Sequence, residues 1–219
     1  MSRVKQLIAN GKSSYNDFGL YIKERNPSLP TRRTNKLSVP GMHGTYDFSE
    51  LYGEVIYDDR TVEYKFDITG WDVEDLDNER RKVLDWIMNI QNTEIVDEYN
   101  PNYHWLGSYE NGSWKEEAEQ GLLTVKFSVY PFAISNEYRD TYFQATSKKE
   151  TITINNESSH RIAPIIITDG NVLIEIGNQR ISLASGEWRV ENFYLLKGEN
   201  EFVVSGNANV CIRYSEEVF

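Results

Sequence analysis

The sequence has a single cysteine and no long hydrophobic run. Cys211 is the only cysteine among 219 residues, which excludes an internal disulfide and favours folding in a reducing cytosol. No stretch approaches the roughly 20 consecutive apolar residues that a membrane helix requires. The opening MSRVKQLIAN also lacks the basic and then apolar layout of a signal peptide. We therefore expect a protein with no membrane insertion.

Basic residues are also few, with 23 Lys and Arg against 34 Asp and Glu and a formal charge of −11. Such a charge repels nucleic acid and anionic membranes, so sequence-specific nucleic acid binding is disfavoured. The hydrophobic fraction of 39% and the aromatic fraction of 13% are too high for a disordered chain. The length fits one large domain or two small ones.

Signatures of catalysis and metal binding are absent from the sequence. His43, His104 and His160 lie in separate segments without partners at metal-ligand spacing, and no nucleophile elbow, phosphate-binding loop or dinucleotide fingerprint occurs. Adjacent acids such as Asp58 and Asp59 would point to opposite faces of a strand, so a wall-degrading glycosidase is the least favoured reading. We expect no catalytic residues, metal or cofactor.

Two distant segments have the alternating pattern of half-buried strands. In residues 61–69 apolar side chains alternate with charged ones, and residues 122–130 repeat the pattern before Pro131. We expect the two strands to pair and to end at the proline. Between them lie a helix and a meander of short strands, with a turn expected at residues 110–112.

The expected helix begins near Asp75 or Asp77, either of which could cap its free amides. Its apolar positions recur at helical spacing and predict packing on one sheet face. They are Val83, Leu84, Ile87, Met88 and Ile90. Trp86 falls near the edge of this stripe and is expected to pack in the core or at its rim.

The segment before these elements predicts a hairpin and an arm. Asn10-Gly11 between two short apolar segments is a hairpin signal. After Pro27 comes the most basic stretch of the chain, read as an exposed arm, with a specific anion or partner site as the alternative. Its Pro and Gly positions predict tight turns at the base of a protruding hairpin. The candidate inter-subunit residues are Pro30, Arg32, Arg33, Pro40, Gly41 and Gly44.

Residues 134–150 are polar with little periodicity and are expected to form a linker. Short strands with close turns follow, at residues 177–178, 197–200 and 206–207, and no helical pattern is present. This spacing predicts a small antiparallel sandwich.

Several segments together resemble one protein family. LIANGKSSYNDFGLYI, VPGMHGTYDFSELYG and GLLTVKFSVYPFAIS are similar to the N-terminal domain of distal tail proteins of long, flexible-tailed bacteriophages, the siphophages. TITINNESSHRIAPIIITDG and KGENEFVVSG resemble the second domain of that family. The resemblance implies a mainly β fold with one α-helix and two domains. Residues 1–136 would form a β-sandwich-like, ring-forming domain with a helix and a protruding arm, and residues 137–219 a galectin-like or carbohydrate-module-like β-sandwich.

The resemblance also implies a structural role in a virion or prophage. Six copies would form a ring at the tail tip, joining the tail tube to tail-associated and baseplate proteins, after synthesis in the cytoplasm of a host bacterium. An acidic wall would suit a channel through which DNA passes. The alternative is a tail protein that binds a cell-wall saccharide through the C-terminal sandwich, with Trp188 as the candidate contact.

Overall fold

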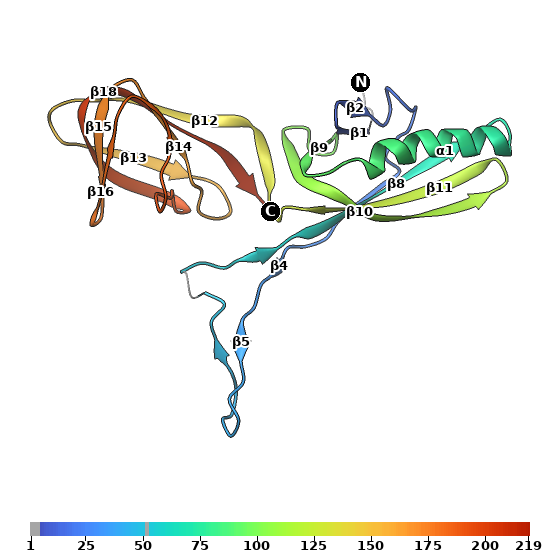
Figure 1. Ribbon diagram of the computed structural model, residues 1–219, viewed down its shortest axis with the longest axis horizontal. Coiled ribbons are helices and arrows are strands. Elements are labelled where there is room, and N and C mark those ends of the chain that lie inside the picture. Colours follow the sequence, from blue (N-terminus) through green and yellow to red (C-terminus); the bar gives the residue numbers. More distant parts are fainter. Residues whose placement is uncertain (1–4, 51–52) are drawn as a thin grey trace. The chain divides into compact units, whose positions relative to one another are not determined.

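The computed structural model describes residues 5–50 and 53–219. Within these residues it is mainly β with one helix, which confirms the predicted class (Figure 1). The chain divides into two compact units, Met1–Ala133 and Ile134–Phe219. The expected boundary at 136/137 lies close to this division. The roles assigned to the two domains stay predictions.

The first unit is built on one antiparallel strand order, β2-β1-β9-β10-β11-β8-β3. Its strands are β1 (Leu7–Ala9), β2 (Lys12–Ser13), β3 (Glu24–Pro27), β8 (Arg60–Thr69), β9 (Thr93–Asp97), β10 (Tyr103–Glu117) and β11 (Gln120–Val129). Asn10 and Gly11 connect β1 to β2 with φ angles of 50° and 71°. Positive φ at both central residues is what a tight hairpin turn needs, so the predicted hairpin is confirmed.

Pairing of β8 with β11 confirms the expectation that these distant segments meet. Tyr64 lies opposite Val125, and Phe66 lies opposite Leu123. Cross-strand partners share a face, and all four of these side chains are buried. β11 ends at Val129, before Pro131, as expected.

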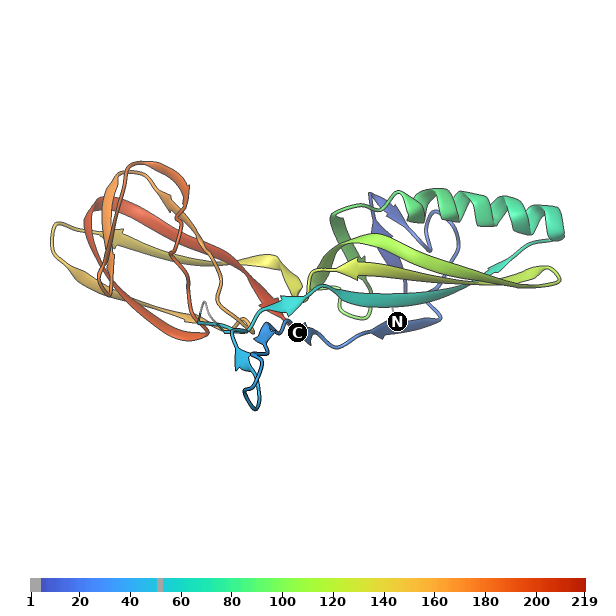
Figure 2. The same ribbon diagram turned by 60° about the horizontal axis from the view of Figure 1, so that its bottom comes forward.

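Helix α1 (Val73–Met88) packs on this sheet, as Figure 2 shows. It begins earlier than expected, because Asp72 is the cap and its carboxylate accepts a hydrogen bond from the amide of Asp75 at 2.8 Å. The predicted stripe is partly wrong: Met88 is exposed. Trp86 is buried in the core, and its indole donates to the carbonyl of Ala9 at 3.0 Å.

The turn expected at residues 110–112 is instead a bulge inside one long strand. β10 continues to Glu117, and its register with β11 shifts between Tyr109 and Asn111. Glu110 is the additional, unpaired residue of the bulge, and β10 and β11 pair on both sides of it. A bulge and a turn share the same polar and Gly-rich composition, so the local sequence did not distinguish them.

The expected linker is also wrong in its first part, because residues there form strand β12 (Ala133–Ala145). Much of β12 is exposed, with Asn136 to Arg139 all exposed in succession. A strand that is exposed on both faces has no need of alternating apolar residues. The periodicity test therefore could not detect it.

The second unit contains two strand groups that share one long strand. β18 (Gly198–Val218) pairs first with β13 (Glu150–Asn156) and β15 (Asn171–Ile176), then with β14 (Ile165–Thr168). β16 (Gln179–Leu183) pairs with β15, and β17 (Gly186–Arg189) pairs with β14. The turn at Gly177-Asn178 is confirmed between β15 and β16. No helix occurs in residues 134–219, all of which the structure describes.

Two turns expected near residues 197–200 and 206–207 fall wholly or mostly within β18. Gly206 has a φ of 155° and pairs with Val172, and a Cβ there would lie 2.3 Å from the carbonyl oxygen of Asn171. The glycine therefore permits a close backbone approach within a continuous strand. Side chains from both strand groups meet in one hydrophobic cluster that includes Ile166, Ile174, Phe202 and Ile212.

Candidate functional site

We define the arm as residues 30–50, and it is the most exposed part of the described chain. Every residue from 31 to 48 is exposed. Within the arm, β5 (Lys36–Leu37) pairs with β6 (Tyr46–Asp47), and at its start β4 (Thr31–Arg32) pairs with β7 (Tyr57–Asp58), which lies beyond the arm in the chain. In Figure 1 it is a narrow ribbon, labelled at β4 and β5, that no second layer of the first unit covers.

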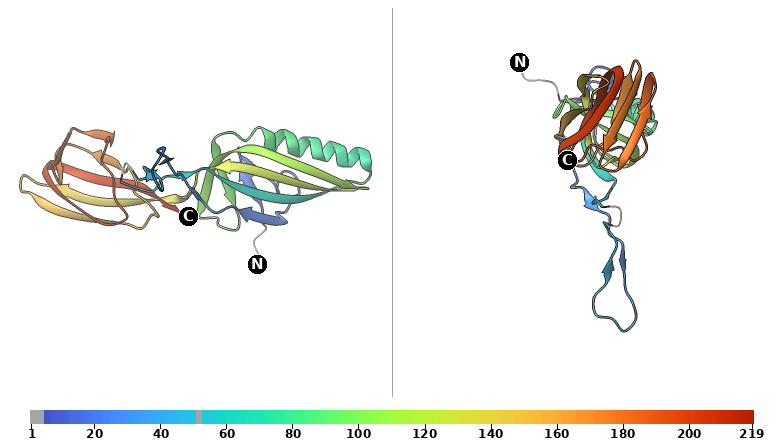
Figure 3. Two further views of the ribbon diagram at one scale, coloured as in Figure 1. Left: turned by 90° about the horizontal axis from the view of Figure 1, so that it is seen from below. Right: turned by 90° about the vertical axis from the view of Figure 1, so that its left-hand side faces the viewer.

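The glycines lie at the far end of the arm and not at its base, which corrects the predicted location of the turns. Gly41 and Gly44 both have a φ of 81° in the loop between β5 and β6. The right-hand view of Figure 3 shows this loop as the open end of the ribbon. Only glycine adopts such angles readily, so Pro40, Gly41 and Gly44 set the shape of the tip.

The basic residues of the arm are neutralised by acids of the arm and of β7. Arg32 contacts Glu50 and Arg33 contacts Asp58, each with a nitrogen to oxygen distance of 2.6 Å. Lys36 lies 3.9 Å from Asp47, its partner across the ladder. Since all of these groups are exposed, each pair adds little stability. They fix the register of the ribbon and leave no concentrated positive patch for an anion.

Ser49 is buried near the base of the arm, and its hydrogen bonds join the chain on the two sides of the ribbon. Its hydroxyl accepts the amide of Asn35 at 2.9 Å, and its own amide donates to the carboxylate of Asp47 at 2.9 Å. Hydrogen bonds from Ser49 lower the pKa of Asp47 below its usual range, and the charges of Lys36 and Arg32 add to this effect. Asp47 is therefore held as an anion.

Trp188, the candidate saccharide contact, lies on β17 opposite Ile166 of β14. Its ring is 40% exposed, and its indole nitrogen already donates to the carbonyl of Ala184 at 2.9 Å. The role of Trp188 as a saccharide contact stays a prediction.

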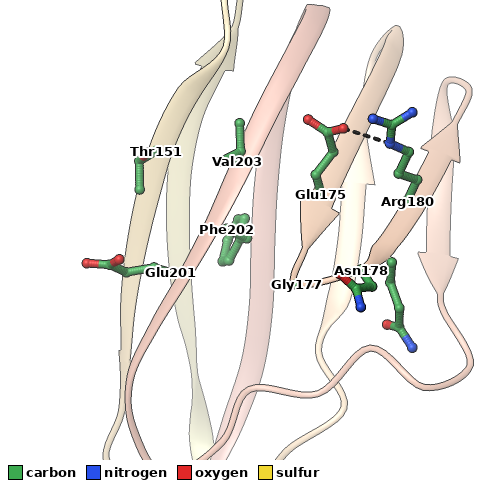
Figure 4. Close-up of a pocket in the computed structure, with 9 residues that line it drawn as sticks. Thr151, Glu175, Gly177, Asn178, Arg180, Glu201, Phe202 and Val203 are labelled. Carbon is green, nitrogen blue, oxygen red and sulfur yellow. Dashed lines mark ion pairs between the residues drawn. The ribbon is translucent and has the colours of Figure 1, made fainter.

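A polar hollow of about 580 Å³ lies beside β15, β16 and β18. Figure 4 shows Glu175 directed toward Arg180, at a distance of 2.9 Å, and Lys149 also contacts Glu175. The hydrogen bond from Lys149 lowers the pKa of Glu175, and Arg180 contributes to the shift. Glu175 is therefore neutralised by Arg180 and Lys149 within this hollow.

The three histidines lie in unrelated environments. His43 is exposed at the arm tip, His104 is 4.0 Å from Glu94, and the ring of His160 lies 2.7 Å from the carboxylate of Glu217. Across residues 5–50 and 53–219, no three or more His, Cys, Asp and Glu side chains are grouped so that they could hold a metal ion. In the same residues, no helix has the length and apolar character needed to cross a membrane.

Comparison with known protein families identifies a match to the first unit. A model described as the phage tail protein RIFT-related domain matches residues 13–129, more than half of the chain. The chain belongs to this family of phage tail proteins. The matched segment includes the whole arm and the β8, α1, β10 and β11 elements, and it ends at Val129, shortly before the end of the first unit at Ala133.

Solved structures similar to this tail protein include the Dit protein of phage SPP1, which is described as a paradigm of the hub adsorption apparatus in phages that infect Gram-positive bacteria. The identity is 12%, the TM-score is 0.73, and the match covers 99% of this chain and 100% of that one. The likeness in fold is therefore to an entire Dit protein. The resemblance to distal tail proteins is confirmed.

Two structures of the phage p2 baseplate in its activated conformation, with Sr and with Ca, also match. Their identity is 8%, their TM-scores are 0.47 and 0.46, and each match covers 97% of this chain and 98% of that one. No curated protein matches the sequence.

Sequence reasoning missed the apolar residues of the arm. Tyr46 lies on β6, and Phe48 directly follows its last residue, Asp47. Alternation over three residues is too short to identify a strand face. The aromatic character of the pair was the available signal, because exposed aromatic side chains are enriched at interfaces.

Proposed function

We propose that this tail protein is a structural, non-enzymatic component of the hub at the tip of a siphophage virion tail. Six copies form a closed ring that joins the tail tube to tail-associated and baseplate proteins and lets DNA pass. Residues 1–136 form the ring, and residues 137–219 lie outside it as a galectin-like sandwich. The family assignment and the likeness to the whole of SPP1 Dit support this proposal.

The arm is the observation that carries the proposal. A two-stranded ribbon is at best marginally stable in water on its own, and here residues 31–48 are all exposed. A protein that functions as a monomer would gain nothing from an exposed ribbon of this kind. A subunit that must contact neighbours gains a contact surface from it.

The test removes the arm and measures assembly. Replacing residues 34–48 by Asn-Gly deletes the β5–β6 ladder and leaves the core of the first unit unchanged, because all deleted residues are exposed. We expect light scattering and negative-stain images to show hexameric rings for the full chain and folded monomers for the deletion. Arg33→Ala is the control: it removes an exposed ion pair with Asp58 and should leave the rings intact.

DNA that passes through the ring must not bind to the channel wall, and the net charge of −11 is compatible with this requirement. A negative channel wall does not retain the phosphate backbone. We expect no gel shift of duplex DNA by the full chain at about 0.1 M salt, where screening acts over roughly 10 Å. Replacing channel-facing acids by lysine should produce a shift and retain DNA in the tail.

The alternative function is binding of a host cell-wall saccharide, and the 40% exposed ring of Trp188 is the observation that favours it. It predicts binding on a glycan array that is lost in Trp188→Ala while the fold is kept. If neither the original protein nor Trp188→Ala binds a saccharide, the saccharide function is refuted and the structural role remains. Binding that Trp188→Ala does not change would place the saccharide elsewhere.

A further inference from the structure

The buried face of β8 begins with a charged residue. From Val62 to Ile68 every second side chain of this strand is buried in the first unit, and the first position of the same row is Arg60. Arg60 is 7% exposed, and it pairs with the buried Val129 of β11. A cation in such a row is costly unless a carboxylate accompanies it.

Arg60 has no such carboxylate in the part of the chain that the structure describes. Its guanidinium carbon lies 4.2 Å from the centroid of the Trp105 ring, which is 5% exposed. The Nε of Arg60 is fully buried without a hydrogen-bond partner. The two terminal nitrogens, which have no partner among the described residues either, are not fully buried. The donors of the guanidinium that face outward are therefore open to a ligand.

The buried acid of this region belongs to another arginine. Asp97 pairs with Arg25 at 2.7 Å and accepts the hydroxyl of Tyr64 at 2.6 Å. Arg25 lies 6.0 Å from the centroid of the same Trp105 ring. Two positive charges against one negative charge leave the group with a surplus of one positive charge. Burial and the charge of Arg25 lower the pKa of Arg60 to about 10, as expected for a cation without its own counter-ion.

Cations and aromatic rings alternate on the other side of Arg25 as well. Arg25 lies 5.6 Å from the centroid of Tyr99, and the Nζ of Lys5 lies 4.6 Å from the same centroid. Lys5 is exposed. We call this arrangement the cation–aromatic row, which consists of Lys5, Tyr99, Arg25, Trp105 and Arg60. Only one of its three cations is paired with a carboxylate of the described chain, although the net charge of the protein is −11.

We propose that Arg60 is the centre of an anion site that takes a carboxylate presented by another protein chain, with Lys5 as an outer cation of the same row. A guanidinium presents its donors in one plane and binds a carboxylate through two parallel hydrogen bonds. Contact with Trp105 already holds Arg60 in place, so little side-chain entropy is lost on binding. The site goes beyond the structural role proposed above, since it holds whether or not the chain forms a ring.

The phosphate of a nucleic acid is the competing anion, and the row is poorly suited to it. Bases stack on open aromatic faces, but Trp105 is buried, and the ring of Tyr99 has Lys5 and Arg25 over it. A nucleic acid also brings many negative charges toward a chain of −11. A single carboxylate brings one negative charge to a group whose surplus is one positive charge.

The first experiment measures stabilisation of the full chain by acetate, the simplest carboxylate. Thermal unfolding is followed at pH 7 in sodium acetate and in sodium chloride of equal ionic strength, at a protein concentration where ultracentrifugation shows single chains. A ligand that binds only the folded state raises the melting temperature. We expect acetate at up to about 0.2 M to raise the melting temperature of the original protein by at least about 2 °C more than chloride does. Arg60→Met should show no such excess.

Two matched variants separate the site from general effects of salt and charge. Arg33→Ala removes an exposed guanidinium that is already paired with Asp58, and it should keep the whole acetate effect. Arg60→Lys keeps the charge but loses the planar pair of donors, so it should keep less than half of the effect. No excess in the original protein, or an equal excess in Arg60→Met or Arg60→Lys, would overturn the site.

Self-association then shows which chain supplies the carboxylate. If a second copy supplies it, Arg60→Met should raise the dissociation constant of self-association at least about tenfold, and acetate should compete with assembly. If a different protein supplies it, self-association should be unchanged while the acetate effect remains. Stabilisation by a short single-stranded oligonucleotide in place of acetate would overturn the choice of a carboxylate. Rings that form without any acetate effect would refute the site alone, whereas a chain that responds to acetate but never assembles would refute the ring alone.

Discussion

The hydroxyl of Tyr64 donates a hydrogen bond of 2.6 Å to the carboxylate of Asp97 inside the first unit. Asp97 is 2% exposed and also receives Arg25 at 2.7 Å. Its other oxygen accepts the amides of Tyr99 and Asn100, at 3.1 Å and 3.3 Å. One buried carboxylate, with hydrogen-bond donors on both of its oxygens, therefore joins strand β8 to β9 and β3.

Removing the hydroxyl in Tyr64→Phe should lower the free energy of unfolding by about 1–3 kcal/mol. The ring keeps its packing, but one acceptor position of a buried carboxylate loses its donor. Urea unfolding at pH 7 measures the change. Tyr109→Phe is the control, since Tyr109 is only partly buried and also contacts Phe127. Equal losses for the two variants would contradict a specific role for the Tyr64–Asp97 bond.

The same pair predicts a dependence of stability on pH. Burial raises the pKa of Tyr64 well above its usual 10, and the charge of Asp97 adds to the shift. The folded state thus holds the proton more tightly than the unfolded state, so this stabilisation is complete below about pH 10 and is lost as the pH rises further. The gap in unfolding free energy between the original protein and Tyr64→Phe should narrow from pH 9 to pH 11. A constant gap would contradict this account.

Gly206→Ala should destabilise the second unit more than Gly198→Ala. Both glycines lie on β18 at positive φ, but a Cβ at Gly206 would lie 2.3 Å from the Asn171 carbonyl oxygen, while Gly198 has nothing within 4 Å. We expect about 1 kcal/mol for Gly198→Ala from backbone strain alone and at least about 3 kcal/mol for Gly206→Ala. Thermal unfolding followed by amide exchange in β13 and β15 measures the difference, and similar melting temperatures would argue against the close approach.

The sequence predicted those elements whose pattern is local and strong. Val62 to Ile68 alternate along β8, the apolar stripe of α1 has helical spacing, and Asn10-Gly11 has the composition of its turn. β12 was missed because exposure on both faces removes the alternation. The sequence predicted a turn at Gly206. A glycine that allows a neighbouring strand to approach closely cannot be distinguished, from the sequence alone, from a glycine that reverses the chain.

The sequence predicted a protruding hairpin, but it did not predict the ion pairs of Arg32 and Arg33 with Glu50 and Asp58. Those acids lie 18 and 25 residues further along the chain. The folded path of the chain brings these residues together, and the β5–β6 register separately places Leu37 opposite Tyr46. The inter-subunit role of Pro30, Arg32, Arg33, Pro40, Gly41 and Gly44 stays a prediction.

Two arginines beside Trp105 should respond in opposite ways to replacement by methionine. The guanidinium carbons of Arg25 and Arg60 lie 6.0 Å and 4.2 Å from the centroid of the indole ring. Arg25 pairs with Asp97, but Arg60, which is 7% exposed, has an Nε without a hydrogen-bond partner in the described part of the chain. Burial and the nearby charge of Arg25 lower the pKa of Arg60 to about 10.

Arg25→Met should therefore cost about 3 kcal/mol, because it leaves the Asp97 carboxylate buried without its cation. Arg60→Met should change the unfolding free energy by less than about 1 kcal/mol or raise it, because a desolvated cation is replaced by an apolar chain that still packs on Trp105. Denaturant midpoints at pH 7 compare the two variants. A large loss in Arg60→Met would show that its charge has a stabilising partner, and an unchanged Arg25→Met would show that Asp97 does not depend on Arg25.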